Sequence, residues 1–188
     1  MNDMKLAFII FDGITWLDFF GVYDPVIRLK TMNYMPDLTW DLCSFTRTVE
    51  DNLHLQVVPN KIKTSLTDYD AIIIPGGQGT RKLIADSNYM DWIRTAGEVK
   101  YKISVCTGSL VLGAAGFLKD KTATTHFNGY GTIKQFCKEV KKERIVADGN
   151  TITAGAVSSS LDLGLYLCNL WAGKEAEIEI RKQIEYRR

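Results

Sequence analysis

The chain has 188 residues, of which 46% are apolar, and this length and composition predict one domain (residues 1–188) with a sizeable hydrophobic core. Its 23 basic and 22 acidic residues give a net charge of +1, which gives no reason to expect nucleic acid as a partner, and no apolar run is long enough to cross a membrane. No signal-peptide cleavage site follows the first apolar run, and four scattered cysteines lack metal or disulfide spacing, so we expect a cytoplasmic protein with reduced thiols.

The N-terminal third predicts a strand, a helix and two further strands. Residues 5–11 form a continuous apolar run, which is typical of a strand covered on both faces. Residues 17–29 carry apolar side chains at near-helical spacing, and Pro25 either kinks this helix or starts a second piece. Strands are predicted at residues 39–46 and 53–58.

The middle of the chain predicts two buried strands, each followed by small residues. Residues 70–75 are a fully apolar strand that runs into the glycine-rich loop 76–79. Residues 81–99 are predicted to be helical, in one or two pieces around residues 86–88. A short apolar strand, residues 103–105, then leads directly into Cys106.

The C-terminal part predicts three helices and a hairpin after the helix that follows Cys106. The helices cover residues 129–141, 157–171 and 174–186, and the hairpin covers residues 144–153 with an Asp148-Gly149 turn. Strands alternating with helices predict an α/β sandwich of three layers, with a mainly parallel central sheet. Ligands of such sheets bind beyond the carboxyl ends of the strands, where residues 12–18, Gly76-Gly77 and Cys106 would meet.

Cys106 lies between a strand and a helix, in the arrangement that presents a nucleophile on a tight turn. Gly108 would let the next helix begin close by, and the amides at the helix N-terminus would point at the thiol and lower its pKa. We therefore predict that Cys106 has a low pKa and that the other three cysteines do not. The alternative is a buried structural cysteine at a strand-to-helix junction.

Asp18 and the Gly76-Gly77 pair are the natural partners of such a thiol. Asp18 is flanked by large apolar residues, and burial near the thiol would raise its pKa into a range suited to proton transfer; alternatively it caps a helix. The amides of Gly77 and Thr107 could form an oxyanion hole, although the glycines could equally serve the turn alone. His126 is either a partner of Cys106 or a hydrogen-bonded histidine of the pocket.

Four segments of the chain resemble the ThiJ/PfpI superfamily, and most closely its isocyanide hydratase group. They are residues 17–21, 74–77, 104–118 and 121–126. The resemblance implies a flavodoxin-like fold related to class I glutamine amidotransferases, a nucleophilic Cys106, an acidic partner Asp18 and a homodimer with the helix after Asp18 near the interface. It also implies that Val157 is a wall residue of a small-molecule pocket, and we expect Trp16, Gly76 and His126 to line the same pocket.

We expect a reaction without metal or organic cofactor, because the sequence has no cluster of metal ligands and its glycine-rich loop 76–79 lacks the Lys-Ser/Thr of a phosphate loop. The Cys106 thiolate would attack the terminal carbon of an isocyanide, Asp18 would manage the proton, and water would release an N-substituted formamide from a thioimidate. The hydratases usually read Leu-Thr-Gly-Pro after the acid, whereas this chain has Phe19-Phe20-Gly21-Val22, so the pocket would differ. The alternatives are a redox- or stress-responsive protein with an oxidisable Cys106, a protease- or amidase-related protein without a proteolytic triad, and a small-molecule-binding module.

Overall fold

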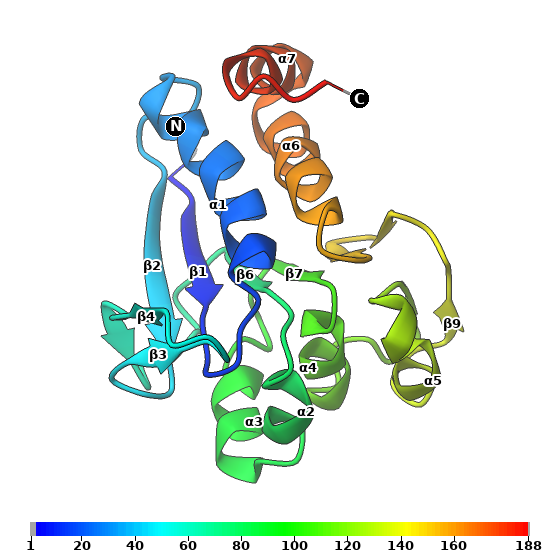
Figure 1. The fold of residues 1–188 in the computed structure, drawn as a ribbon. Helices are drawn as coiled ribbons and strands as arrows, with labels where there is room; N and C mark the ends of the chain where they lie inside the picture. Colours follow the sequence, from blue (N-terminus) through cyan, green and yellow to red (C-terminus); the bar gives the residue numbers. More distant parts are fainter. Residues whose placement is uncertain (1–2, 188) are drawn as a thin grey trace.

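A seven-stranded sheet forms the middle layer of the molecule in the computed structural model, which describes residues 3–187 (Figure 1). Its strands are β1 (Lys5–Ile9), β2 (Thr39–Ser44), β5 (Lys61–Ile62), β6 (Ala71–Ile74), β7 (Tyr101–Val105), β10 (Ile145–Asp148) and β11 (Thr151–Ala154). They are arranged in the order β10-β11-β7-β6-β1-β2-β5, and every neighbouring pair is parallel except β10 and β11. The prediction of a mainly parallel central sheet is therefore confirmed.

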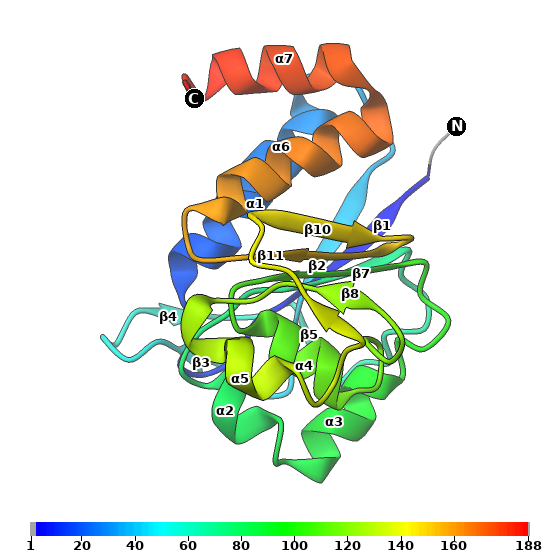
Figure 2. The ribbon, with the colours of Figure 1, turned by 90° about the vertical axis from the view of Figure 1, so that its right-hand side faces the viewer.

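Helices cover both faces of this sheet and complete the three layers (Figures 1 and 2). One face carries α1 (Trp16–Thr31), α6 (Ser159–Ala172) and α7 (Lys174–Gln183). The other face carries α2 (Thr80–Leu83), α3 (Ser87–Arg94), α4 (Gly108–Ala114) and α5 (Tyr130–Ile133), the last preceded by the 3₁₀ turn η1 (Phe127–Gly129). Two small additions lie outside the main sheet: β3 (Val49–Glu50) with β4 (Gln56–Val57), and β8 (Thr122–Ala123) with β9 (Glu139–Val140).

The hydrophobic core follows from the apolar runs of the sequence. Strands β1 and β6 are buried almost throughout, because helices pack on both of their faces. Pro25 lies inside α1 without dividing it, so of the two alternatives the second helical piece is wrong. Residues 81–99 contain parts of two helices, which agrees with the alternative of two pieces. No helix within residues 3–187 is both long and apolar enough to cross a membrane.

The predicted helix at residues 129–141 is wrong beyond its first turn. Helix α5 ends at Ile133, and Phe136 packs against Gly113 of α4. The backbone N–H groups of Lys138 and Lys141 then donate to the carbonyls of Lys121 and Ala123, which starts the pairing of β9 with β8. Pairing with a distant segment therefore outweighs the local helical pattern in this stretch.

Two further boundaries differ from prediction for local reasons. The predicted strand 53–58 is a turn followed by the short β4, because the Asp51 carboxylate accepts the N–H groups of Leu53 and Leu55 and His54 takes a φ of 71°. The turn of the predicted C-terminal hairpin is Gly149-Asn150, one residue later than expected, since Asp148 still pairs with Thr151.

Candidate active site

The predicted residues Asp18, Gly76 and Cys106 lie together beyond the ends of three neighbouring strands. Strands β1, β6 and β7 are adjacent and parallel, so the segments after their carboxyl ends meet at one edge of the sheet. A Cβ atom built on Gly76 would lie 2.7 Å from Asp18 Oδ2, from Cys106 Cβ and from the Thr107 nitrogen. Asp18, Cys106 and Thr107 therefore converge around the backbone of Gly76, and only glycine fits between them.

Two hydrogen bonds to Gly76 hold Asp18 and the residue before α1 in place. The Thr15 N–H donates to the Gly76 carbonyl over 2.9 Å, and the Gly76 N–H donates to Asp18 Oδ2 over 3.0 Å. Helix α1 begins at Trp16 after Thr15, so Asp18 is not the N-cap residue and that alternative is wrong. The Asp18 side chain is fully buried, and its Oδ1 accepts no hydrogen bond within the described residues.

Burial sets the protonation of Asp18. It raises the pKa of the carboxyl from 3.8 to about 6, while the Gly76 N–H and the nearby Cys106 thiol pull the pKa down by smaller amounts. The expected rise of the Asp18 pKa is therefore confirmed. A carboxyl with a pKa near 6 can accept and return a proton close to neutral pH.

The Cys106 backbone has the strained conformation of a nucleophile elbow. Its φ is 53°, a left-handed value that costs about 1–3 kcal/mol for a non-glycine residue. Three hydrogen bonds hold it there: the Cys106 N–H donates to the Ala154 carbonyl, and the hydroxyls of Thr125 and Ser109 both donate to the Cys106 carbonyl.

The predicted role of the small residue after the elbow is confirmed by the packing. A Cβ on Gly108 would lie 2.1 Å from the Ile74 carbonyl oxygen, so only glycine lets α4 start against the end of β6. Thr125 was not predicted from the sequence as a site residue. Its only signal there is its place next to His126.

The prediction of a low pKa for Cys106 is wrong. Burial, and then the negative charge of Asp18, raise the pKa of this thiol to about 12, against smaller lowering effects from the Thr107 N–H and hydroxyl. Helix α4 has only seven residues, so the N-terminal amides do not offset the loss of water around a nearly enclosed sulfur. Burial raises the pKa of Cys43, Cys137 and Cys168 as well, so Cys106 is not set apart by acidity.

Thr107 and Gly77 are joined by two hydrogen bonds. The Gly77 N–H donates to Thr107 Oγ1 over 3.0 Å, and the same hydroxyl lies 3.1 Å from the Gly77 carbonyl oxygen, to which it donates. The Thr107 N–H points to the Cys106 sulfur. Of the two amides expected to form an oxyanion hole, only that of Thr107 therefore faces the thiol.

The remaining predicted pocket residues, Trp16, His126 and Val157, lie in different local settings. Trp16 begins α1, is almost buried, and has an indole N–H without a hydrogen-bond partner in the described chain. His126 caps η1 by accepting the Asn128 N–H at Nδ1, and no hydrogen bond joins it to Cys106 among the described residues. Val157 lies in the turn before α6, where its carbonyl accepts from Ser160.

The two phenylalanines after Asp18 have different surroundings. Phe19 is buried, stacks on Tyr23 at 5.1 Å between ring centroids and meets Phe8 edge-on, so it belongs to the core. Phe20 is 46% exposed and lies beside Trp16, at 6.0 Å between ring centroids. Of the two phenylalanines, Phe20 is therefore the one that solvent or a ligand can reach.

Comparisons with known proteins identify relatives that match most of the chain. The model of the DJ-1/PfpI family matches residues 4–170. This chain belongs to the DJ-1/PfpI family. Isonitrile hydratase from Pseudomonas putida is 34% identical over 97% of this chain and 78% of its own length.

Solved structures of the family show the same fold. A THiJ/PfpI family protein from Pseudomonas syringae superposes with a TM-score of 0.90 at 27% identity, over 100% of this chain and 77% of that one. DJ-1beta from Drosophila melanogaster superposes with a TM-score of 0.84 over 99% of this chain and 100% of that one; at 19% identity this likeness concerns the fold alone. The resemblance identified from four sequence segments is therefore confirmed as family membership.

Proposed function

We propose that this protein hydrates isocyanides to N-substituted formamides, with Cys106 as nucleophile and Asp18 as proton carrier. The observation that supports this best is the buried pair itself, a carboxyl with a pKa of about 6 beside a thiol with a pKa of about 12. At neutral pH this pair holds one proton, on sulfur, and a ready base next to it. The 34% identity to isonitrile hydratase supports the same substrate class.

The first half of the reaction forms a carbon–sulfur bond. The sulfur of Cys106 attacks the terminal carbon of the isocyanide while Asp18 takes the thiol proton, and Asp18 then gives that proton to the same carbon. The product is a thioimidate, in which the former isocyanide carbon carries one hydrogen and a double bond to nitrogen. The Thr107 N–H lies at the sulfur and stabilises negative charge there.

The second half consumes one water. Asp18 takes a proton from the water as its oxygen adds to the thioimidate carbon, and then gives that proton to the nitrogen. The carbon–sulfur bond breaks as the new hydroxyl becomes the formamide carbonyl, and the hydroxyl proton passes to the sulfur, which restores the thiol. Isocyanide and water give formamide, so no oxidant, reductant or metal enters the balance; within residues 3–187, no three metal-ligating side chains form a group that could hold an ion.

The raised pKa of Cys106 favours this enzyme over the redox alternative. Peroxide reacts with thiolates, and a thiol with a pKa of about 12 is almost entirely protonated at neutral pH. An isocyanide in contact with the pair needs no free thiolate, because Asp18 removes the proton during the attack. The protease- or amidase-like alternative lacks support as well, since neither His54 nor His126 forms a hydrogen bond with Cys106.

We also propose a homodimer, on narrower grounds than the sequence suggested. The expected apolar face of α1 is mostly used within the chain, because Phe19 and Val22 are buried in its own core. Leu17 and Phe20 remain 56% and 46% exposed at the start of α1. A second copy covering this end of α1 would enclose the approach to Asp18, and sedimentation showing a monomer at micromolar concentration would contradict it.

Turnover of a panel of alkyl and aryl isocyanides tests the proposed reaction, with the formyl proton of the product followed by NMR. We expect formamide to appear, and kcat/KM to rise as pH increases through about 6, because the base form of Asp18 is needed. Absence of formamide from every isocyanide, together with rapid conversion of Cys106 to the sulfinic acid by peroxide, would replace the hydratase with the redox function.

A further inference from the structure

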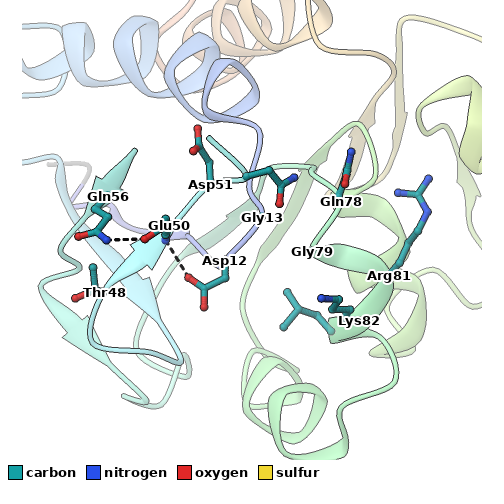
Figure 3. Close-up of a pocket in the computed structure, with 12 residues that line it drawn as sticks. Asp12, Gly13, Thr48, Glu50, Asp51, Gln56, Gln78, Gly79, Arg81 and Lys82 are labelled. Carbon is teal, nitrogen blue, oxygen red and sulfur yellow. Dashed lines mark hydrogen bonds between the residues drawn. The ribbon is translucent and has the colours of Figure 1, made fainter. Parts of the chain in front are cut away.

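A large open cleft lies one loop away from Cys106 and has no part in the proposed reaction (Figure 3). Its volume is about 1130 Å³. It is lined by three segments that are distant in the sequence: Asp12 and Gly13; Thr48, Glu50, Asp51, Asn52 and Gln56; and Gln78, Gly79, Arg81, Lys82 and Leu83. Neither Asp18 nor Cys106 lines it.

Glycine contacts and backbone hydrogen bonds build the base of the cleft. A Cβ on Gly79 would lie 1.9 Å from the Asp12 carbonyl oxygen, so the two loops touch there. The Gly13 N–H donates to the Glu50 carbonyl over 2.8 Å, and the Glu50 N–H donates to Asp12 Oδ1 over 2.9 Å. The cleft is therefore a fixed feature of the fold and not a gap between loose loops.

One wall of the cleft is acidic. It carries Asp12, Glu50 and Asp51, the last two from the segment that contains the β3–β4 hairpin (Figure 3). Hydrogen bonds from Gln56 and His54 lower the pKa of Glu50, so it stays a carboxylate. These carboxylates do not converge as metal ligands would, because the described residues contain no group of three that could hold an ion. The wall suits an organic cation such as an ammonium group.

The opposite wall is basic. Arg81 and Lys82 belong to the short helix α2 and are exposed (Figure 3). Of the ion pairs formed within residues 3–187, none joins either side chain to a carboxylate across the cleft. The two cations and the three carboxylates thus lie on opposite walls without forming ion pairs across the cleft. A ligand that carries both a positive and a negative charge could pair with both walls.

We propose that this cleft binds a short zwitterionic peptide, with its ammonium end on the acidic wall and its carboxylate end at Arg81 and Lys82. The cleft volume of about 1130 Å³ is slightly above the usual range for ligand sites, about 300–1,000 Å³, and is more than one free amino acid needs. Thr48, Asn52, Gln56 and Gln78 add neutral donors and acceptors for the peptide backbone between the two ends.

Titration of the intact protein with unblocked trialanine, followed by calorimetry or NMR, tests the site. We expect saturable binding that weakens as salt is added, because both contacts are solvent-exposed ion pairs. The Arg81→Gln/Lys82→Gln variant should bind about two- to thirtyfold more weakly. The control Lys119→Gln/Lys134→Gln, which removes two exposed cations that do not line the cleft, should bind as the wild type does.

Blocked probes make the test specific for the two ends. Amidation of the trialanine carboxylate should weaken binding to the wild type but not to Arg81→Gln/Lys82→Gln, and N-acetylation should weaken binding to the wild type but not to Asp12→Asn/Asp51→Asn. The asparagine variants keep the oxygens that accept backbone N–H groups, so the hairpin should stay folded. Absence of saturable binding at millimolar trialanine, or equal binding of the fully blocked probe, would overturn the proposal.

Discussion

Two carboxyl groups lie on either side of one glycine-rich loop, and their pKa values are shifted in opposite directions. Asp18, behind Gly76, is fully buried, and burial raises its pKa to about 6. Glu50, across the cleft that Gln78 and Gly79 line, lies among side-chain donors that lower its pKa. The difference shows how one fold gives two carboxyl groups different protonation near neutral pH: a carboxyl buried away from water has a raised pKa, and one with hydrogen-bond donors and solvent remains a carboxylate.

The largest effect we expect concerns the nucleophile. Cys106→Ser should lower isocyanide turnover by at least about 10⁴-fold, since a serine hydroxyl at this site is a far poorer nucleophile than the thiol. Steady-state kinetics measure this loss. The control is Cys168→Ser, whose sulfur is buried against the Pro25 carbonyl in another part of the core. Equal turnover in the two variants would mean that Cys106 is a structural cysteine.

Removing the base should have the next largest effect. Asp18→Asn keeps an oxygen for the Gly76 N–H but cannot accept a proton, so kcat should fall by about 10²–10⁴-fold while the fold is retained. Asp24→Asn is the matched control, because Asp24 lies on the same helix, is more exposed than Asp18 and pairs with the half-buried Arg28. Circular dichroism and turnover are measured on both, and an Asp18→Asn enzyme with wild-type turnover would remove Asp18 from the mechanism.

A change in stability sharpens the contrast between the crowded site and the open surface. Gly76→Ala would place a methyl group 2.7 Å from Asp18 Oδ2, Cys106 Cβ and the Thr107 nitrogen, so we expect a loss of about 1–3 kcal/mol in the free energy of unfolding. Gly131→Ala meets nothing within 4 Å and should cost no stability. Thermal melts compare the two, and equal melting temperatures would show that the site is less tightly packed than described.

The most specific effect is on the pH dependence of stability. The pKa of Asp18 is about 6 in the fold against 3.8 for an unperturbed carboxyl, so the folded state binds this proton more tightly. Its contribution is fully present below pH 3.8 and is lost as pH rises through about 6, a change of about 3 kcal/mol at 1.36 kcal/mol per pKa unit. The unfolding free energy of the wild type minus that of Asp18→Asn should fall by this amount between about pH 4 and about pH 8. A difference that stays constant with pH would show that the pKa of Asp18 is not raised in the folded state.

Much of the site could be predicted from the sequence because it depends on local order along the chain. A buried strand followed by Cys106 and Gly108 specifies the elbow, and apolar neighbours around Asp18 indicate a buried acid. Parallel strands then bring these segments to one edge of the sheet without further information.

The rest depends on contacts between distant segments. The pKa of Cys106 is set by how completely the fold excludes water and by its distance from Asp18, and no local pattern gives either. The stretch 129–141 follows the pairing of β8 with β9, and the charged cleft needs three separated segments to meet. Such features are fixed only when the whole chain has folded.

The central claim is that Asp18 removes the Cys106 proton during attack on the isocyanide, and a rapid-quench experiment tests it most directly. The protein is mixed with an isocyanide over a range of pH, quenched in acid, and the adduct on Cys106 is measured by intact and peptide mass spectrometry. We predict an adduct of the mass of the isocyanide on Cys106, forming at a rate that rises as pH passes about 6 and then levels off. A rate that keeps rising with pH toward the ionisation of the thiol, or is the same in Asp18→Asn, would contradict the account.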